Sequence, residues 1–299
     1  MRIGIDLGGT KIAGAILDAD DNACGVARVA APAKDYAATL KAISGLVETL
    51  EAKAGAVASS IGIGVPGSVD RKTGQITAGF QAGMHGKNIG IDLKAMLGRD
   101  VKVANDANCF ALSEALSGAG VGGEVVFGAI LGTGVGGGIV VNGKLLAGLN
   151  ALGGEWGHIP LPEPRDDERP GPMCNCGKHG HIESWLSGPG FVADFARRAG
   201  IEVAHAPSPA DIVKMIETDP VAEETLSRFE ERLARALIPI IRTIDPDVIV
   251  LGGGLSNIDR IYETVPPLLK MHFKAFGLRT KIVRNMHGDS SGVRGAAWL

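Results

Sequence analysis

The segment spanning residues 153–183 carries the side chains whose types and spacing most clearly suggest chemistry. Its two cysteines and three histidines are interspersed with glycines, and a glutamate stands near each end. The residues concerned are Glu155, His158, Cys174, Cys176, His179, His181 and Glu183. Thiolate sulfur and imidazole nitrogen together suit a zinc ion, and carboxylates beside them could hold a hydroxyl-rich ligand. This combination indicates an enzyme in which a metal-stapled loop presents carboxylates to a small molecule.

Four of these side chains are expected to bind zinc. Cys174 and Cys176 supply two ligands, His181 supplies a third, and the intervening loop brings back His158 as the fourth. His179 competes with His181, and the spacing does not decide between them. A C-x-C pair with two nearby histidines is more specific than a lone histidine, although solvent-exposed histidines and incidental thiols are the alternative. Four protein ligands would make a closed, structural zinc site rather than a catalytic one.

A glycine turn near the N-terminus could contact phosphate. It consists of Asp6, Gly8, Gly9, Thr10 and Lys11. Glycines let backbone N–H groups approach phosphate oxygens, Asp6 could bind Mg²⁺ through water, and the Thr10 and Lys11 side chains could touch phosphate. A plain Gly-Gly hairpin explains the pattern equally well.

Two further glycine turns could serve a nucleotide. Gly132, Thr133 and Gly134 begin a G-x-G-x-x-G pattern, but a strand and a turn follow where a dinucleotide site requires a helix. We therefore expect a phosphate-contacting hairpin there instead. Gly252, Gly253 and Gly254 follow a buried strand and precede a helix expected to begin near Ser256. Bare glycines at that strand end leave room for a nucleotide, and a tight strand–helix loop is the alternative.

Asn105 and Asp106 stand between a predicted strand and a predicted helix. Asn and Asp often cap helix N-termini, and from these residues alone the cap is the favoured interpretation. The functional alternative is a general base that faces a substrate hydroxyl.

The 299-residue chain has the composition of an ordinary globular protein, with 45% hydrophobic residues, 21% charged residues and a net charge of −3. This balance gives no electrostatic reason to expect nucleic acid or an anionic membrane surface as a partner. The chain enters a strand pattern at once, without a signal-peptide core, and no segment has about eighteen uninterrupted apolar residues. Because Cys174 and Cys176 are too close for an ordinary disulfide framework, we expect a reducing, cytoplasmic setting.

The candidate residues lie on a recurring pattern of strands, turns and helices. Strands are expected at 2–7, 12–17, 24–29, 60–65 and 101–104, with helices over 36–54 and from 106 to about 117. Strands follow at 125–131, 138–141, 144–146, 248–251 and 281–284, with helices over 221–244, after 254 and from 292. The repeated order of strand, glycine turn, strand and strand predicts two related α/β lobes around a cleft.

These ordered motifs together resemble the ROK family of sugar kinases over nearly the whole chain. They are D-L-G-G-T-K (6–11), A-N-D-A-N-C (104–109), L-G-T-G-V-G-G-G (131–138), G-E-W-G-H (154–158), C-N-C-G-K-H-G-H-I-E (174–183), D-P-D-V-I-V-L-G-G-G-L-S-N (245–257) and H-G-D-S-S-G-V-R-G-A-A-W-L (287–299). The resemblance implies the two-lobed actin/hexokinase/Hsp70-like (ribonuclease H-like) fold, with a ligand cleft between the lobes. It also implies a homodimer that uses Mg²⁺ and ATP to phosphorylate a hexose, usually on the 6-hydroxyl.

The resemblance assigns roles position by position. Asp106 matches the catalytic base. The residues that match sugar contacts are Gly67, Ser68, Asn105, Asp106, Glu155, His158 and Glu183. The glycine turns at 8–10, 132–134 and 252–254 match nucleotide-binding elements. His158 would then both bind zinc and contact the sugar, which its two ring nitrogens permit.

The resemblance is closest to the bacterial fructokinase, or manno(fructo)kinase, branch, so fructose is the expected acceptor. Kinases of N-acetylglucosamine, N-acetylmannosamine or glucose in the same family are the alternatives. A non-catalytic sugar-binding regulator is more distant, because such members carry an added helix-turn-helix before the first strand. The expected lobes are residues 1–119, completed by a helix over 289–299, and residues 120–288, which carry the zinc loop.

Two departures from the family pattern affect these expectations. His181 stands where the family has a third cysteine, which still allows zinc, with altered affinity. Residues 78–86 lack the Asn-rich stretch with a tryptophan that relatives carry beside the sugar pocket, which leaves the preferred sugar open.

Overall fold

The first of two five-stranded sheets is built mainly from the N-terminal part of the chain. The computed structural model describes residues 1–32, 35–77 and 83–299. The strands of this sheet are β1 (Arg2–Leu7), β2 (Lys11–Leu17), β3 (Ala23–Ala30), β4 (Ser60–Val65) and β5 (Val101–Asn105), in the order β3-β2-β1-β4-β5. The first three pair antiparallel, and β4 and β5 run parallel to β1, so β1, β4 and β5 end at one edge of the sheet.

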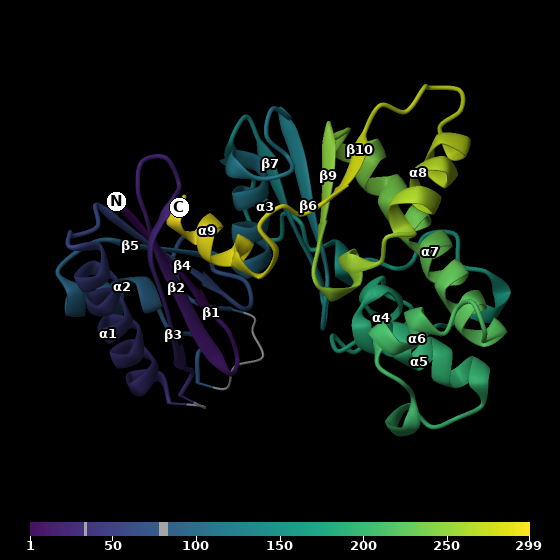
Figure 1. The fold of residues 1–299 in the computed structure, drawn as a ribbon, viewed down its shortest axis with the longest axis horizontal. Coiled ribbons are helices and arrows are strands. Elements are labelled where there is room, and N and C mark those ends of the chain that lie inside the picture. The colour runs from purple at the N-terminus through teal and green to yellow at the C-terminus, as the bar shows by residue number, and fades with distance from the viewer. Residues whose placement is uncertain (33–34, 78–82) are drawn as a thin grey trace. The chain divides into compact units, whose positions relative to one another are not determined.

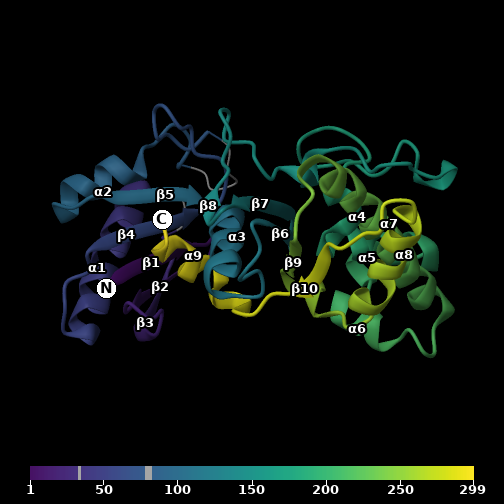
Figure 2. The ribbon, with the colours of Figure 1, turned by 90° about the horizontal axis from the view of Figure 1, so that it is seen from above.

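Helices cover both faces of this sheet (Figures 1 and 2). The helices α1 (Tyr36–Ala54) and α2 (Ile89–Leu97) pack on one face, and α3 (Asp106–Ser117) and α9 (Ser291–Ala297) pack on the other. The α1 helix begins where the Asp35 side chain accepts the Ala38 N–H and ends at Gly55 in the left-handed conformation. Its apolar face is buried against the isoleucines of β1 and β4.

The α9 helix approaches the sheet through glycines. A Cβ atom at Gly4 of β1 or Gly62 of β4 would overlap the carbonyl oxygens of Val293 and Ala296, and one at Gly295 would overlap that of Cys109. Any larger residue would push the backbones apart, so these positions require glycine. In Figure 1 the yellow α9 lies directly on the purple strands.

The fully buried carboxylate of Glu114 fastens α3 to the segment that leads into α9. Its Oε2 accepts the N–H groups of Ala119 and Met286 at 3.0 and 2.9 Å. Its Oε1 accepts the His287 N–H at 3.1 Å and the Ser291 hydroxyl at 2.8 Å. These four hydrogen bonds replace the water that the buried charge has lost.

The second sheet repeats the strand order of the first. Its strands are β6 (Val125–Leu131), β7 (Val135–Val141), β8 (Lys144–Leu145), β9 (Val248–Gly252) and β10 (Lys281–Arg284), in the order β10-β9-β6-β7-β8. Strands β6, β9 and β10 are parallel, and β7 and β8 form a hairpin in which Asn142 and Gly143 both have positive φ. Matched in chain order, the five strands occupy corresponding positions in the two sheets, as the repeated pattern predicts.

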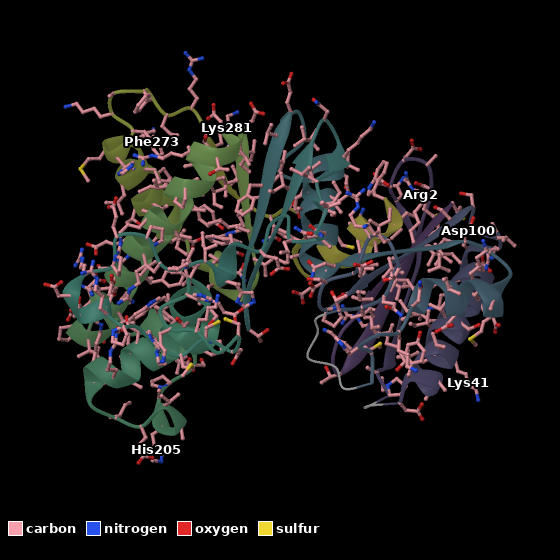
Figure 3. All side chains as sticks on the ribbon, turned by 180° about the vertical axis from the view of Figure 1, so that it is seen from behind. Arg2, Lys41, Asp100, His205, Phe273 and Lys281 are labelled. Atoms are coloured by element: carbon pink, nitrogen blue, oxygen red, sulfur yellow. The ribbon has the colours of Figure 1, made fainter. Side chains whose placement is uncertain are left out.

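Between the strands β8 and β9 of the second sheet lie the helices α4 (Glu183–Leu186), α5 (Gly188–Ala199), α6 (Pro209–Lys214) and α7 (Pro220–Ile244), and α8 (Ile261–His272) lies between β9 and β10. Short 3₁₀ helices occur at η1 (Trp156–His158), η2 (Asp166–Glu168), η3 (Val203–His205), η4 (Gly254–Asn257) and η5 (Gly288–Ser290). Buried Arg232 of α7 binds Glu168 at 2.8 Å and Asp194 at 2.5 Å, which ties the loop before the cysteines to α5 and α7. Phe273 and Lys281 lie at one end of this helical region and His205 at the other (Figure 3).

The chain divides into two compact units. One contains residues 1–122, 138–154 and 286–299, and the other contains residues 123–137 and 155–285. The division of the lobes expected from the sequence, at residues 119/120 and 288/289, stays a prediction. In the part of the chain that the structure describes, no helix combines the length and the apolar character needed to span a membrane.

Most predicted elements are confirmed within one to three residues. The prediction of a helix from about Ser256 was wrong, because η4 occupies residues 254–257 and α8 begins only at Ile261. The strand after the second glycine turn begins at Val135, and it confirms that a strand rather than a helix follows this turn.

Candidate functional site

Two aspartates lie at the edge of the first sheet where β1, β4 and β5 end. Asp6 of β1 is in register with Gly64 of β4, which is in register with Ala104 of β5, two residues before Asp106. The pKa of Asp6 is raised to about 6, chiefly by burial and then by the negative charge of Asp106, while the ammonium of Lys11 opposes both effects. An ionised pair of carboxylates in such a place attracts a divalent cation.

Asn105 connects the start of α3 to the turn after β4. Its Oδ1 accepts the N–H groups of Ala107 and Asn108 at 2.9 and 3.2 Å, which confirms that it caps the helix. Its Nδ2 donates to the carbonyl oxygen of Gly67 at 3.1 Å. Gly67 has a φ of 98°, and the neighbouring Ser68 is buried. The predicted sugar contacts of this unit therefore lie together.

The first glycine turn is the β1–β2 hairpin. The Gly8 N–H donates to the carbonyl oxygen of Lys11 at 3.0 Å, and Gly9, Thr10 and Lys11 are exposed. The turn lies directly after Asp6, so the predicted phosphate contacts and the acidic pair share one end of the sheet.

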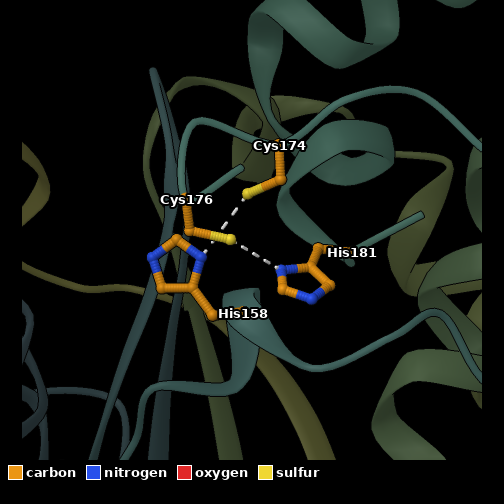
Figure 4. Close-up of side chains that lie close together, drawn as sticks. All are labelled: His158, Cys174, Cys176 and His181. Atoms are coloured by element: carbon orange, nitrogen blue, oxygen red, sulfur yellow. Dashed lines mark hydrogen bonds between the residues drawn. The ribbon is translucent and has the colours of Figure 1, made fainter. Parts of the chain in front are cut away.

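Four predicted metal ligands converge in the other unit (Figure 4). One ligand atom from each of His158, Cys174, Cys176 and His181 lies within 4.8 Å of the others. The sulfur of Cys174 is 3.6 Å from Nδ1 of His158, and that of Cys176 is 3.2 Å from Nδ1 of His181. His179 instead lies 3.0 Å from the carbonyl oxygen of Gly171, so the structure brings His181 rather than His179 to the cluster.

The surroundings of the cluster shift the pKa values of two of its side chains. The pKa of Cys174 is raised to about 11, chiefly by burial; a hydrogen bond from the Cys176 backbone opposes the rise, and the side chains of Cys176 and Glu183 add to it. Burial, followed by the charges of His158 and Lys178, lowers the pKa of His181. At neutral pH the imidazole is therefore ready to bind a cation, whereas the Cys174 thiol must first lose its proton.

Two carboxylates flank the cluster. Burial raises the pKa of Glu155, with Glu183 adding to the rise and His158 opposing it. The Glu183 Oε1 accepts the S–H of Cys174 at 3.7 Å, and its Oε2 accepts the N–H of Val135 at 3.0 Å. Glu183 thus joins the cysteine loop to the residue that follows the second glycine turn.

The second and third glycine turns lie against each other. Gly253 has a φ of 80°, and a Cβ on it would lie 2.5 Å from the Leu131 carbonyl oxygen and 2.9 Å from the Gly132 nitrogen. The Gly188 N–H, at the start of α5, donates to the carbonyl oxygen of Gly132 at 2.7 Å. The structure therefore brings the predicted turns at 132–134 and 252–254 together.

A cavity of about 950 Å³ lies beside these two turns. Apolar side chains from α5, α6 and η4 form much of its wall, among them Val192, Pro209, Val213 and Leu255. Sequence analysis missed these residues, because apolar positions on helices are indistinguishable from ordinary core positions until the chain is folded. An apolar cavity next to backbone-rich turns suits a ligand with a flat, weakly polar part and a phosphate part.

The sequence departs from the family pattern at residues 78–86, and of this segment residues 78–82 lie outside the described residues. Of the remainder, Met84 is buried and Gly86 has a φ of 74°.

The two sheets have the same strand order, an acidic pair lies at the end of the first sheet, and paired glycine turns lie beside an apolar cavity at the end of the second. Together these features define a phosphotransferase of the actin/hexokinase-like fold. Residues 2–299 match the ROK family, and the chain belongs to that family.

Solved structures confirm the predicted fold class. A ROK hexokinase from Thermus thermophilus is 29% identical, with a TM-score of 0.88 over 99% of this chain and 96% of that one. A ROK family glucokinase from Streptomyces griseus, solved with glucose and AMPPNP, is 27% identical, with a TM-score of 0.77 over 100% and 98% of the two chains.

Relatives that are named as sugar kinases are similar over nearly their full length. The N-acetyl-D-glucosamine kinase of Vibrio cholerae is 40% identical over 100% of this chain and 99% of its own. That of Erwinia tasmaniensis is 41% identical over the same shares. The predicted family and the predicted class of enzyme, a sugar kinase, are confirmed. The closer resemblance to fructokinases is not supported, since these relatives favour the alternative sugar.

Proposed function

We propose that this protein transfers the γ-phosphoryl group of ATP to the 6-hydroxyl of N-acetyl-D-glucosamine. The observation that carries the choice of sugar is the identity of about 40% to N-acetyl-D-glucosamine kinases along the entire chain. This proposal replaces fructose, the acceptor expected from the sequence. We further propose a cytoplasmic homodimer, on the family resemblance.

Asp106 is proposed to act as the catalytic base. It is the first residue of α3, where Asn105 fixes the backbone by capping the helix. The carboxylate would accept the proton of the 6-hydroxyl as its oxygen attacks the γ-phosphorus and ADP leaves. Phosphoryl transfer depends chiefly on the positions and charges of the groups around the reacting atoms, so the rigid start of a helix is a suitable support for the catalytic carboxylate.

Asp6 and the glycine turns are proposed to serve the phosphates of ATP. Bound Mg²⁺ would neutralise phosphate charge, and Asp6 would orient it through water. The glycines of the turns at 8–10, 132–134 and 252–254 let the backbone of each turn come close to phosphate oxygens. The apolar cavity beside the second and third turns would take the base.

The sugar hydroxyls are proposed to be held by Gly67, Ser68, Asn105, Asp106, Glu155, His158 and Glu183. Asn105 already uses both ends of its amide on the backbone, which fixes its direction. Carboxylates accept hydrogen bonds from hydroxyls and thereby select the sugar by the positions of its hydroxyls.

The cluster of His158, Cys174, Cys176 and His181 is proposed to bind a structural Zn²⁺. Two thiolates and two imidazoles form a closed tetrahedral ligand set, which would staple the loop that carries Glu155 and Glu183. Nδ1 of His158 points to the cluster, which leaves Nε2 for a sugar hydroxyl.

The test is ADP release with Mg²⁺ and ATP against N-acetylglucosamine, N-acetylmannosamine, glucose, mannose and fructose. We expect the highest kcat/KM for N-acetylglucosamine, with a phosphate ester at the 6-position of the product identified by NMR. A higher kcat/KM for another sugar would refute the assigned acceptor. Absence of ADP release with every sugar, from folded and zinc-loaded protein, would refute the kinase itself.

A further inference from the structure

The segment of residues 183–188, which forms α4 and the start of α5, holds the second glycine turn at both of its ends. At one end, the Gly188 N–H donates to the carbonyl oxygen of Gly132 at 2.7 Å. At the other end, the Val135 N–H donates to Oε2 of Glu183 at 3.0 Å. The packing is close, since a Cβ on Gly134 would lie 2.8 Å from the same Glu183 oxygen. This turn is therefore fastened from outside as well as by its own hydrogen bond between Gly132 and Gly134.

The same segment, residues 183–188, is continuous with the cysteine and histidine cluster. The Ser184 N–H and hydroxyl both donate to the carbonyl oxygen of His181, at 3.0 and 2.7 Å. Oε1 of Glu183 lies 3.7 Å from the sulfur of Cys174. Two of the proposed zinc ligands are thus linked to the glycine turn through contacts of Glu183 and Ser184.

Glycine-rich turns need such support because glycine has more backbone conformations to lose than any other residue. A hydrogen bond to a carboxylate is stronger than one to a neutral oxygen, so Glu183 restricts the direction of the Val135 amide and of the turn before it. Glu155, the other carboxylate beside the cluster, makes neither of the two hydrogen bonds that fasten the turn.

We propose that Glu183 is a positioning residue for the phosphate-binding turn at residues 132–134, in addition to its role with the sugar. The affinity for nucleotide then depends on a side chain that stands beside the acceptor sugar and the metal cluster. This inference rests on the proposed function, because it requires the turn to bind nucleotide. It predicts that loss of Glu183 weakens nucleotide binding even when no sugar is present.

The experiment measures binding of Mg²⁺·ADP by calorimetry without sugar, to the full chain loaded with zinc. Glu183→Ala is expected to weaken ADP binding by about tenfold, as for the loss of one hydrogen bond to a charged group. Glu183→Gln keeps an acceptor for the Val135 N–H and should stay within about threefold of the unaltered protein. Glu183→Asp keeps the charge but withdraws the oxygen by more than ~1 Å, so it should resemble Glu183→Ala.

Glu155→Ala is the matched control. It removes a carboxylate from the same loop and should leave ADP binding unchanged, while both alanine variants weaken binding of N-acetylglucosamine. Unchanged ADP affinity in Glu183→Ala would overturn the inference, and so would an equal loss in Glu155→Ala, which would indicate general damage to the loop. If Glu183→Ala does not fold, Glu183→Asp decides by the same criteria. Failure of the unaltered protein to bind ADP would instead overturn the proposed nucleotide site, and this inference with it.

Discussion

The side-chain amide of Asn105 donates to the carbonyl oxygen of Gly67 over 3.1 Å. The residue that caps α3, and so fixes the backbone of Asp106, thereby also holds the turn that follows β4. Two groups that the family resemblance assigns to the sugar are thus fixed by a single side chain. Substitutions at Asn105 can therefore separate what the helix cap contributes to stability from what the turn at Gly67 contributes to sugar binding.

Asn105→Asp is expected to keep the helix cap, because aspartate caps as well as asparagine, and to lose the hydrogen bond to Gly67. The KM for the sugar should rise by about tenfold, while the free energy of unfolding changes by less than ~1 kcal/mol. Asn105→Ala should in addition lose about 1–2 kcal/mol of stability. Sugar kinetics and urea unfolding of both variants test this. Equal stability of the two variants would contradict the assigned cap.

Asp106→Asn is expected to lower kcat by at least ~10²-fold, since an amide cannot accept the proton of the attacking hydroxyl. The sugar Kd should change only a few-fold, because the amide is similar in size and can still bind hydroxyls. Stopped-time ADP assays and sugar calorimetry give the two quantities. A variant that turns over at the normal rate would exclude Asp106 as the base.

The raised pKa of Asp6 predicts a pH-dependent requirement for Mg²⁺. A proton and the cation compete for the carboxylate, whose pKa without metal is about 6. The Mg²⁺ concentration for half-maximal activity should therefore rise as the pH falls, by about fourfold between pH 7.5 and 5.5. Mg²⁺ titrations at several pH values, with ATP saturation kept constant, measure it. The same half-saturation at both pH values would exclude this role of Asp6.

Zinc binding is expected to strengthen as the pH rises. Cys174, with a pKa of about 11 in the absence of metal, must lose its proton to become a ligand. Each proton released makes the affinity about tenfold stronger per pH unit. Competition with a chromophoric chelator at pH 6, 7 and 8 measures this. Cys176→Ser should lose metal, whereas Cys24→Ser, which alters an exposed cysteine outside the cluster, should not. Equal metal content in the two variants would contradict the proposed site.

Glu114→Gln is expected to lower the free energy of unfolding by about 3 kcal/mol. The carboxylate accepts hydrogen bonds from the N–H groups of Ala119, Met286 and His287 and from the hydroxyl of Ser291. Glutamine keeps one acceptor oxygen, but its NH₂ group faces the two donors that bind the other carboxylate oxygen. Glu48→Gln on the exposed side of α1 is the control and should stay within ~0.5 kcal/mol. Urea unfolding that gave similar losses for both variants would refute the anchoring role.

Much of the sheet structure could be predicted from the sequence, because apolar alternation and glycine turns are local signals. The α5 helix was not predicted, since Gly188, Pro189 and Gly190 look like a loop. In the fold the Ser187 side chain caps Gly190, and proline is compatible with a first helical turn.

In the candidate site, too, features that are local in the sequence could be predicted, whereas contacts between residues far apart in the sequence could not. The zinc ligands could be proposed because their spacing is short and their chemistry is unusual. The contact between Glu183 and Val135 joins residues 48 positions apart through a backbone amide, which every residue type carries. No pattern of side chains reports such a contact. The choice of sugar was likewise beyond the motifs, which are shared by kinases of several hexoses.

The glycine-lined contact between α9 and the first sheet also has a consequence during protein synthesis. Synthesis of the chain reaches Gly4 of β1 long before it reaches α9, the helix that covers this glycine. At roughly 5–20 residues per second, synthesis of the roughly 290 residues between them takes about 15 to 60 s. During that time the part of β1 and β4 that α9 covers lacks this helix as a partner, and its backbone and apolar side chains offer a binding surface to chaperones. The N-terminal strands of this enzyme must therefore wait for the C-terminal helix before their own unit is complete.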